Sequence, residues 1–178
     1  MIFENTAIEG VVLIKRTSST DERGYFARLY CENEFREAGI HERFVQANLC
    51  FNEKKGTLRG IHYQMGKQED KLVSCIRGRI WDVCVDLRAD SETYLKYVAY
   101  ELSEENQQML YIPKGCAHGY MTLEDNSQLV YMMSEFYIPG NDAGYRYDDP
   151  AFKIPWPSVD GTFVISEKDK NLPYHGKN

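Results

Sequence analysis

The stretch KLVSCIRGRIWDVCVDLR, Lys71–Arg88, decides the fold class of this chain. Val73–Ile76 and Arg79–Leu87 are two apolar runs, and Arg77-Gly78 between them predicts a tight connection. Side chains in the second run alternate with a period of two, so that one face carries Trp81, Val83, Val85 and Leu87 and the other carries Asp82, Cys84 and Asp86. This alternation predicts a β-strand with two different faces.

Further short runs of the same kind follow along the chain, separated by turn residues. They are Val11–Lys15, Tyr25–Tyr30, Phe44–Phe51, Leu58–Gln64, Tyr97–Leu102, Met109–Ile112, Gly119–Leu123 and Ser127–Tyr137. Glu32–Ala38 is expected to form a short helix that ends at Gly39. Many short strands with little helix predict an antiparallel β-sandwich or barrel, and the pattern leaves the strand order open.

Length, charge and cysteine content exclude several classes of protein. The 178 residues suit one domain, spanning residues 1–178. A net charge of −6 disfavours nucleic acid as a partner, although a local basic pocket can still bind an anion. The five cysteines form no CxxC pair and show no zinc-ligand spacing. No signal peptide or membrane-spanning stretch is visible, so we expect a cytoplasmic protein that contacts no membrane.

Polar residues interrupt four otherwise apolar segments, namely Gln46–Asn48, Arg59–Gln64, Lys71 and Gly115–Tyr120. Because buried polar groups are costly unless they are paired, their concentration predicts a lined cavity. Gln46 and Asn48 share one face of a strand, and Tyr131 and Tyr137 share one if Ser127–Tyr137 is a single regular strand. Taken alone, His62 is more typical of a hydrogen-bonded core histidine, and Tyr131 of packing.

Taken in order, the motifs closely resemble the dTDP-4-dehydrorhamnose 3,5-epimerase family over nearly the whole chain. They are DERGYF at Asp21–Phe26, FVQAN at Phe44–Asn48, LRGIHYQ at Leu58–Gln64, KLV at Lys71–Val73, IWDVCVDLR at Ile80–Arg88, LSEENQQMLYIPKGCAHGY at Leu102–Tyr120, LVYM at Leu129–Met132, DDP at Asp148–Pro150, WP at Trp156-Pro157 and SEKD at Ser166–Asp169. The resemblance implies an all-β, cupin-like jelly-roll antiparallel β-sandwich with a few short helices. It also implies a homodimer, and an interface through Val11–Lys15 is one way to form it.

The resemblance further implies epimerisation of a nucleotide-diphospho-4-keto-6-deoxy sugar at C3 and C5, with no cofactor and no metal. The ketone acidifies the protons on both neighbouring carbons, and His62 matches the base that removes them. Asp169 matches the acid that orients His62. Lys71 matches a cation near the developing enolate, and Tyr131 matches the acid that returns a proton to the opposite face of the sugar.

Substrate-binding positions carry over in the same way. Arg23, Arg59 and His118 match contacts to the diphosphate or sugar, Gln46 and Asn48 match contacts to the nucleotide or sugar, Tyr137 matches an aromatic that stacks on the base, and Asp142 and Lys168 match further contacts. The sequence departs from the usual pattern at four places near these contacts, where Arg28, Phe136, Asp142 and Tyr147 replace Glu, Tyr, Glu and Trp.

Three other interpretations stay open from the sequence. A relative that inverts only C3 or only C5, or that takes a CDP- or GDP-linked sugar, could keep the same catalytic residues. A metal-dependent cupin needs several histidines at one ion, and this chain has four, with His62 standing alone in its strand. A sandwich that binds a nucleotide sugar without catalysis is the non-enzymatic alternative.

Overall fold

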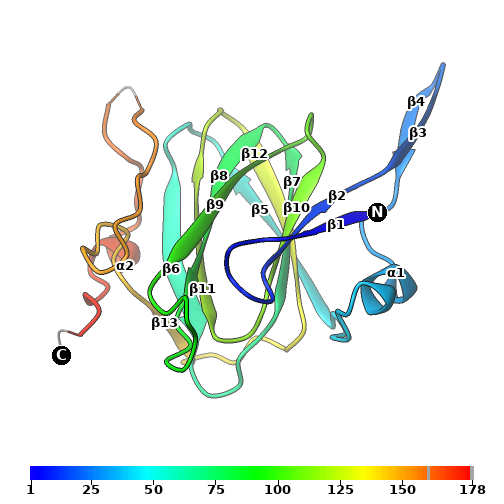
Figure 1. Ribbon diagram of the computed structural model, residues 1–178. Coiled ribbons are helices and arrows are strands. Elements are labelled where there is room, and N and C mark those ends of the chain that lie inside the picture. Colours follow the sequence, from blue (N-terminus) through cyan, green and yellow to red (C-terminus); the bar gives the residue numbers. More distant parts are fainter. Residues whose placement is uncertain (160, 177–178) are drawn as a thin grey trace.

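The computed structural model describes residues 1–159 and 161–176, and two antiparallel sheets face each other across its centre (Figure 1). The six-stranded sheet runs in the order β1 (Ile2–Asn5), β2 (Val12–Lys15), β10 (Gln108–Ile112), β7 (Lys71–Arg77), β12 (Ser127–Met133) and β5 (Gln46–Asn52). The five-stranded sheet runs β13 (Asp142–Gly144), β6 (Leu58–Gln64), β11 (Cys116–Thr122), β8 (Arg79–Asp86) and β9 (Tyr97–Ser103). The predicted cupin-like antiparallel sandwich is confirmed.

Apolar side chains from both sheets fill the space between them. Val73 and Leu129 from the six-stranded sheet pack in one buried cluster with Ile80 and Leu102 from the five-stranded sheet. The outer face of the six-stranded sheet is covered by α1 (Glu32–Glu37), whose Phe35 is fully buried. The outer face of the five-stranded sheet is covered by the C-terminal segment through Phe152. Each outer face of the sandwich therefore carries a covering segment.

The connection at Gly78 carries the chain from one sheet to the other. The two strands predicted around Arg77-Gly78 are β7 and β8, but they belong to different sheets and do not pair with each other. Gly78 has a φ of 70°, and a Cβ there would lie 2.6 Å from Ser127 Oγ and 3.2 Å from Ser127 Cα. Glycine therefore permits a crossing that passes close to β12.

Three element boundaries differ from the prediction by three residues or more. β12 ends at Met133 rather than at Tyr137, because its two neighbouring strands begin at the residues paired with Met133, Lys71 on β7 and Gln46 on β5. Tyr131 and Tyr137 therefore do not share one strand. The predicted strand at Tyr25–Tyr30 is shorter, as β4 (Gly24–Ala27), and β11 begins before the predicted Gly119.

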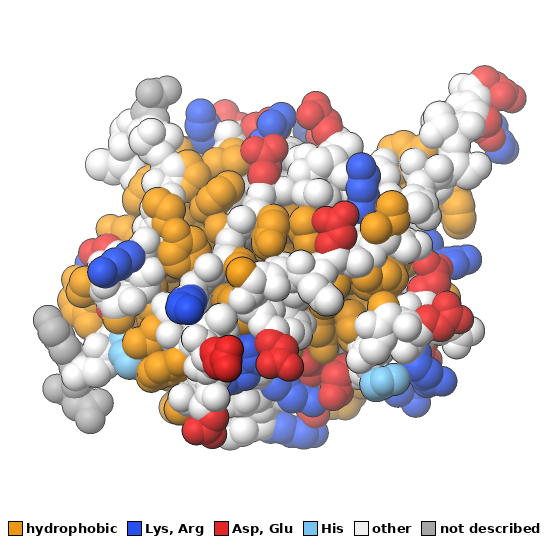
Figure 2. Space-filling view, viewed as in Figure 1, with side chains coloured by type: hydrophobic (Ala, Val, Ile, Leu, Met, Phe, Trp, Pro, Cys, Tyr) orange, Lys and Arg blue, Asp and Glu red, His pale blue; other side chains and the backbone are white. Residues whose placement is uncertain are grey.

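The hairpin of β3 (Ser18–Asp21) and β4 projects away from the sandwich, with charged side chains at its tip (Figures 1 and 2). Tyr25 and Phe26 on it are 56% and 76% exposed.

The expectation that Val11–Lys15 pairs across an interface is wrong, because β2 is hydrogen-bonded to β1 on one side and to β10 on the other. A second short helix, α2 (Glu167–Lys170), lies beyond β6. In the part of the chain that the structure describes, neither helix is long and apolar enough to span a bilayer.

Candidate active site

A cavity of about 280 Å³ lies between the two sheets at the end where the polar residues gather. Its walls come from β5, β7 and β12 on one side and from β6, β11 and β13 on the other, with loop residues at the rim. Seven of the predicted site residues line it, namely Asn48, His62, Lys71, His118, Tyr131, Tyr137 and Asp142. Four more lining residues were not predicted as site residues, namely Tyr63, Gln64, Glu69 and Met133.

His62 and Asp169 form a hydrogen-bonded pair at this cavity. Asp169 Oδ1 lies 2.8 Å from His62 Nε2, and Asp169 Oδ2 accepts from the backbone N–H of Gly60 at 3.1 Å. The helix α2 holds Asp169 in place, since its N-cap Ser166 accepts from the Asp169 N–H. Burial opposes ionisation of Asp169, but the hydrogen bonds, that to His62 foremost, hold its pKa below the usual value. With Nε2 bound to a carboxylate, Nδ1 is the other ring nitrogen of His62 and can still donate or accept a hydrogen bond.

A β-bulge in β6 places Arg59 and His62 on the same face. His62 pairs with His118 and Arg59 pairs with Tyr120, so three residue steps on β6 oppose two on β11. A regular strand would put these two side chains on opposite faces. At the bulge Gly60 has a φ of 117°, and a Cβ there would lie 2.6 Å from Gly119 Cα. The bulge therefore requires glycine, and sequence alternation alone does not reveal it.

A second histidine–carboxylate pair stands beside the first. His118 Nε2 lies 2.7 Å from Asp82 Oδ1, and the Asp82 side chain is fully buried in β8. Burial raises the pKa of Asp82, while the neighbouring His118 acts against that rise. The sequence prediction omitted Asp82 from the site, although alternation placed it on the same strand face as Cys84, which packs between the sheets. That alternation was the available signal.

Lys71 and Tyr131 reach the cavity from the six-stranded sheet. Lys71 begins β7, and its Nζ lies 3.1 Å from Glu69 Oε1. Tyr131 on β12 is the register partner of Asn48 on β5. Burial raises the pKa of the Tyr131 phenol, which keeps it protonated and able to donate a proton at neutral pH. The base and the acid expected from the sequence thus face one cavity from different sheets.

Four of the eight predicted binding residues meet at the rim of the cavity. Gln46 Oε1 accepts from the backbone N–H of Tyr137 at 3.1 Å, and the Tyr137 hydroxyl donates to Asp142 Oδ2 at 2.9 Å. Lys168 Nζ lies 3.6 Å from the same Asp142 oxygen. Arg59 Nε donates to Asn52 Oδ1 at 3.0 Å, so Arg59 reaches across from β6 to β5. These contacts join residues from four separate segments.

Arg59 shares the strand face of His62 without lining the cavity, and Arg23 is not brought to the cavity at all. It lies at the turn of the projecting hairpin, its side chain is 83% exposed, and its guanidinium pairs with Asp21.

Within residues 1–159 and 161–176, no three His, Cys, Asp or Glu side chains are grouped so that they could hold a metal ion.

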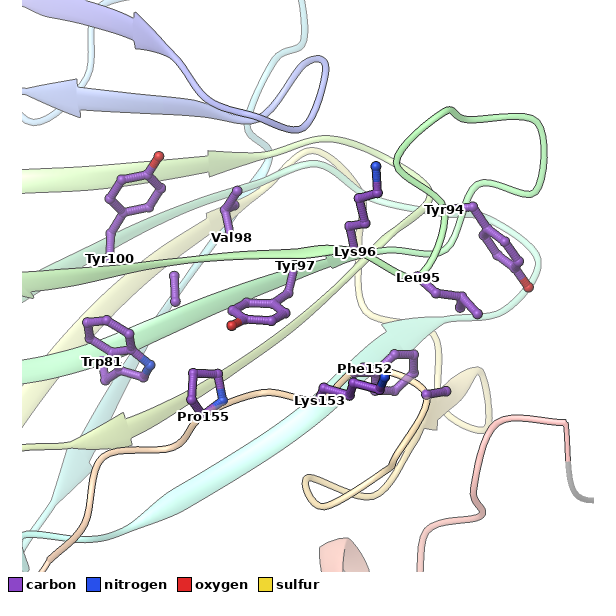
Figure 3. Close-up of a pocket in the computed structure, with 12 residues that line it drawn as sticks. Trp81, Tyr94, Leu95, Lys96, Tyr97, Val98, Tyr100, Phe152, Lys153 and Pro155 are labelled. Carbon is purple, nitrogen blue, oxygen red and sulfur yellow. The ribbon is translucent and has the colours of Figure 1, made fainter.

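A larger hollow of about 860 Å³ lies elsewhere, on the outer face of the five-stranded sheet. Trp81 and Tyr97 from the sheet face Phe152 and Pro155 from the C-terminal segment (Figure 3), and hydrophobic side chains gather over β9 on this side of the molecule (Figure 2). Its lining has two lysines but no acid–base pair. The smaller cavity between the sheets is lined by His62, Lys71 and Tyr131, the residues that the sequence predicted for catalysis.

The arrangement matches a known family along almost the whole chain. The profile of the dTDP-4-dehydrorhamnose 3,5-epimerases matches residues 5–176. The chain belongs to the dTDP-4-dehydrorhamnose 3,5-epimerase family. It is 43% identical to the dTDP-4-dehydrorhamnose 3,5-epimerase of Methanothermobacter thermautotrophicus over 170 residues, which cover 95% of this chain and 91% of the relative.

Solved structures support the assignment. The structure of dTDP-4-dehydrorhamnose 3,5-epimerase from Elizabethkingia anophelis has a TM-score of 0.92 and 39% identity, covering 98% of this chain and 96% of that one. The Legionella pneumophila enzyme in complex with dTDP-4-keto-L-rhamnose has a TM-score of 0.93 and 36% identity, covering 97% and 92%. The family resemblance predicted from the motifs is confirmed, and with it the assignment to the epimerases, a class of isomerase.

Proposed function

We propose that this protein inverts C3 and C5 of a nucleotide-diphospho-4-keto-6-deoxy sugar, converting dTDP-4-dehydro-6-deoxy-D-glucose into dTDP-4-dehydro-L-rhamnose. The observation that carries the proposal is the His62–Asp169 pair, which shares one cavity with Lys71 and Tyr131 in a chain of this family. The relatives named above are 3,5-epimerases, and one was solved with a dTDP-4-keto sugar.

Each proposed catalytic residue has a defined part in the proton transfers. His62 removes the proton from a carbon next to the ketone, and Asp169 stabilises the imidazolium that forms. The electron pair moves to the ketone oxygen, where the ammonium of Lys71 stabilises the enolate. Tyr131 then donates a proton to the carbon, and the electron pair returns from oxygen to restore the ketone. His62 then releases its proton to water and Tyr131 takes one up from water, which restores the base and the acid. The same steps at the second carbon complete the reaction, and no oxidant or reductant is consumed.

The size of the cavity suggests how the substrate is divided between interior and rim. A volume of about 280 Å³ suits a sugar ring but not a whole nucleotide sugar. The nucleotide would therefore lie at the rim, against Tyr137 and Gln46, with Asp142 and Lys168 close by. Arg59 and His118 are placed to bind diphosphate or sugar oxygens, because both donate charge-assisted hydrogen bonds when protonated.

Proton NMR of dTDP-4-dehydro-6-deoxy-D-glucose with the purified protein in D₂O tests the proposal. Loss of the proton signals at both C3 and C5, with formation of the L-rhamno product, is the expected result. Loss at one carbon alone would make the protein a single-site relative. Without any exchange, CDP- and GDP-linked sugars are tried next, and inactivity with tight binding would leave the non-catalytic interpretation.

We also propose that the protein works as a homodimer in the cytoplasm. The projecting hairpin exposes Tyr25 and Phe26, and an isolated two-stranded hairpin with exposed aromatic side chains gains stability when another chain covers it. A partner subunit is also the way for the highly exposed Arg23 to meet a substrate. The five cysteines are free thiols, which suits a reducing compartment.

Light scattering after size-exclusion chromatography tests the dimer. Wild type is expected at twice the mass of one chain, and Phe26→Asp at the mass of one. Tyr94→Asp, which alters an exposed tyrosine outside the hairpin, serves as the control. A wild-type protein at the mass of one chain would contradict the proposal.

A further inference from the structure

Glu69 is a buried carboxylate at the edge of the cavity between the sheets. Its side chain is 5% exposed, and both of its oxygens are engaged. Oε1 lies 3.1 Å from Lys71 Nζ, and Oε2 accepts from Gln64 Nε2 at 2.9 Å. A carboxylate is removed from water at considerable cost unless charge and hydrogen bonds compensate it, so this placement calls for a reason.

Glu69 contacts one side chain from each sheet, and one of these is the ammonium group of Lys71. Gln64 is the last residue of β6 in the five-stranded sheet, and Lys71 is the first residue of β7 in the six-stranded sheet. Glu69 lies on the connection between them and contacts both side chains. Glu69 therefore links the Lys71 ammonium on one sheet to Gln64 on the other.

Among the described residues that line this cavity, Lys71 is the only lysine, and there is no arginine. A lysine at the end of a strand has a long, flexible side chain that tends to extend towards water. The Lys71 side chain is nevertheless only 12% exposed. An ammonium group carries three N–H donors, and the ion pair with Glu69 uses one and leaves others for a ligand oxygen.

We propose that Glu69 is a positioning residue that holds the ammonium of Lys71 at the place where the ketone oxygen of the substrate develops negative charge. This inference rests on the proposed function, since it gives Lys71 its task. It predicts that the loss of Glu69 slows the chemical step more than it weakens binding, because the charge on Lys71 remains but its location is no longer fixed.

The neighbouring Asp70 provides a matched control. It is also buried, at 3% exposure, and it pairs with Lys114 Nζ at 3.3 Å, but it does not line the cavity. Glu69→Ala is expected to lower kcat by about 10- to 100-fold with KM changed by less than about threefold. Asp70→Asn is expected to keep kcat within about threefold of wild type at temperatures where both variants are folded. Glu69→Gln, which retains an oxygen for Lys71, is expected to lie between wild type and Glu69→Ala.

A double-variant cycle separates positioning from general stabilisation. Since Glu69 acts through Lys71, the Glu69→Ala change is expected to cost less than about twofold in kcat when it is added to Lys71→Met. If adding Glu69→Ala to Lys71→Met lowers kcat by a further factor of about 10 or more, the inference is overturned. An unchanged kcat in the single variant Glu69→Ala would overturn it as well.

Competitive reductive methylation, read by mass spectrometry, tests the same point without any substrate. Without Glu69 the flexible Lys71 side chain is free to extend towards water, so Lys71 is expected to be methylated at least about fivefold faster in Glu69→Ala than in wild type, and at the wild-type rate in Asp70→Asn. Equal Lys71 labelling in wild type and Glu69→Ala would overturn the positioning role even if the protein proved inactive on the dTDP sugar. An inactive wild type with the expected labelling would contradict the proposed function alone.

Discussion

His62 and His118 are register partners on the adjacent antiparallel strands β6 and β11, and each ring gives its Nε2 to a carboxylate. The two pairs differ in access, because the His62 side chain is 41% exposed and that of His118 is 12% exposed. A base must reach a carbon-bound proton of the substrate, so the more accessible ring is the better placed of the two. This difference supports His62 as the base and His118 as a binding residue.

Replacing His62 with alanine is therefore expected to abolish proton exchange at both C3 and C5. General-base catalysis contributes about 10²- to 10⁴-fold, so exchange in D₂O should fall by at least that factor. Proton NMR measures it, with His41→Ala as the control because His41 is exposed and lies outside the cavity. Residual exchange at one carbon at the normal rate would show that a second base serves that carbon.

Tyr131→Phe is expected to permit exchange but to impair inversion. The variant keeps the base and the ammonium, so the enolate still forms, and reprotonation then comes from the side of His62. The measurement compares the deuterium incorporated at each carbon with the amount of epimer formed, and inversion is expected to fall by about 10²-fold. Tyr100→Phe on β9 is the matched control. If Tyr131→Phe inverts at the normal rate, another group is the acid.

Asp169→Asn is expected to change how stability depends on pH. Burial opposes ionisation of Asp169, but the hydrogen bond with His62 and its other contacts lower its folded pKa. A carboxylate with a folded pKa below its unfolded value of about 3.9 contributes stability that is complete above that value. The contribution is lost as the pH falls through the folded pKa. Urea unfolding at several pH values between 3 and 6 should therefore show the gap between wild type and Asp169→Asn narrowing in acid.

The control for that experiment is Asp90→Asn, because Asp90 is exposed. Its unfolding free energy should stay parallel to that of wild type over the same pH range. A gap between wild type and Asp169→Asn that does not change with pH would mean that Asp169 contributes no pH-dependent stability.

Gly60→Ala is expected to be strongly destabilising. Its φ is 117°, and the new Cβ would meet backbone atoms, Gly119 Cα at 2.6 Å and His118 O at 2.8 Å. Because neither atom can move without disrupting β11, the free energy of unfolding should fall by at least about 3 kcal/mol. Gly140→Ala is the matched control, since Gly140 also has a positive φ but open space around it, and about 1–2 kcal/mol is expected there. Chemical denaturation measures both, and equal losses would contradict the steric argument.

The strands could be predicted from the sequence because a period of two is a local property. The alternation in β8 was enough to separate the face that carries Val83 and Val85 from the face that carries Cys84. The crossing at Gly78 was not predicted, since a tight turn looks the same whether the next strand joins the same sheet or the other one. The end of β12 was not predicted either, because it depends on where the partner strands β5 and β7 begin, and both lie far from Met133 in the chain.

The residues of the candidate site could be predicted where their motifs resembled a family. They could not be predicted where the register between two strands decides which way a side chain points. Asp169 is 107 residues from His62, and the resemblance rather than the residue pattern connected the two. The bulge that brings Arg59 to the face of His62 depends on the register of β11, which no local pattern encodes. Glu69 lies in a polar connection typical of any turn, so its burial had no sequence signal.

The placement of His62 and Tyr131 on different sheets has a consequence for stereochemistry. A sugar ring lying between two layers presents one side to each layer. Under the proposed roles, a hydrogen leaves on the side of one layer and arrives on the side of the other, and the ring never has to turn over in the enzyme. The handedness of the product is then determined by the order of the layers, a property of the whole sandwich that no single side chain supplies.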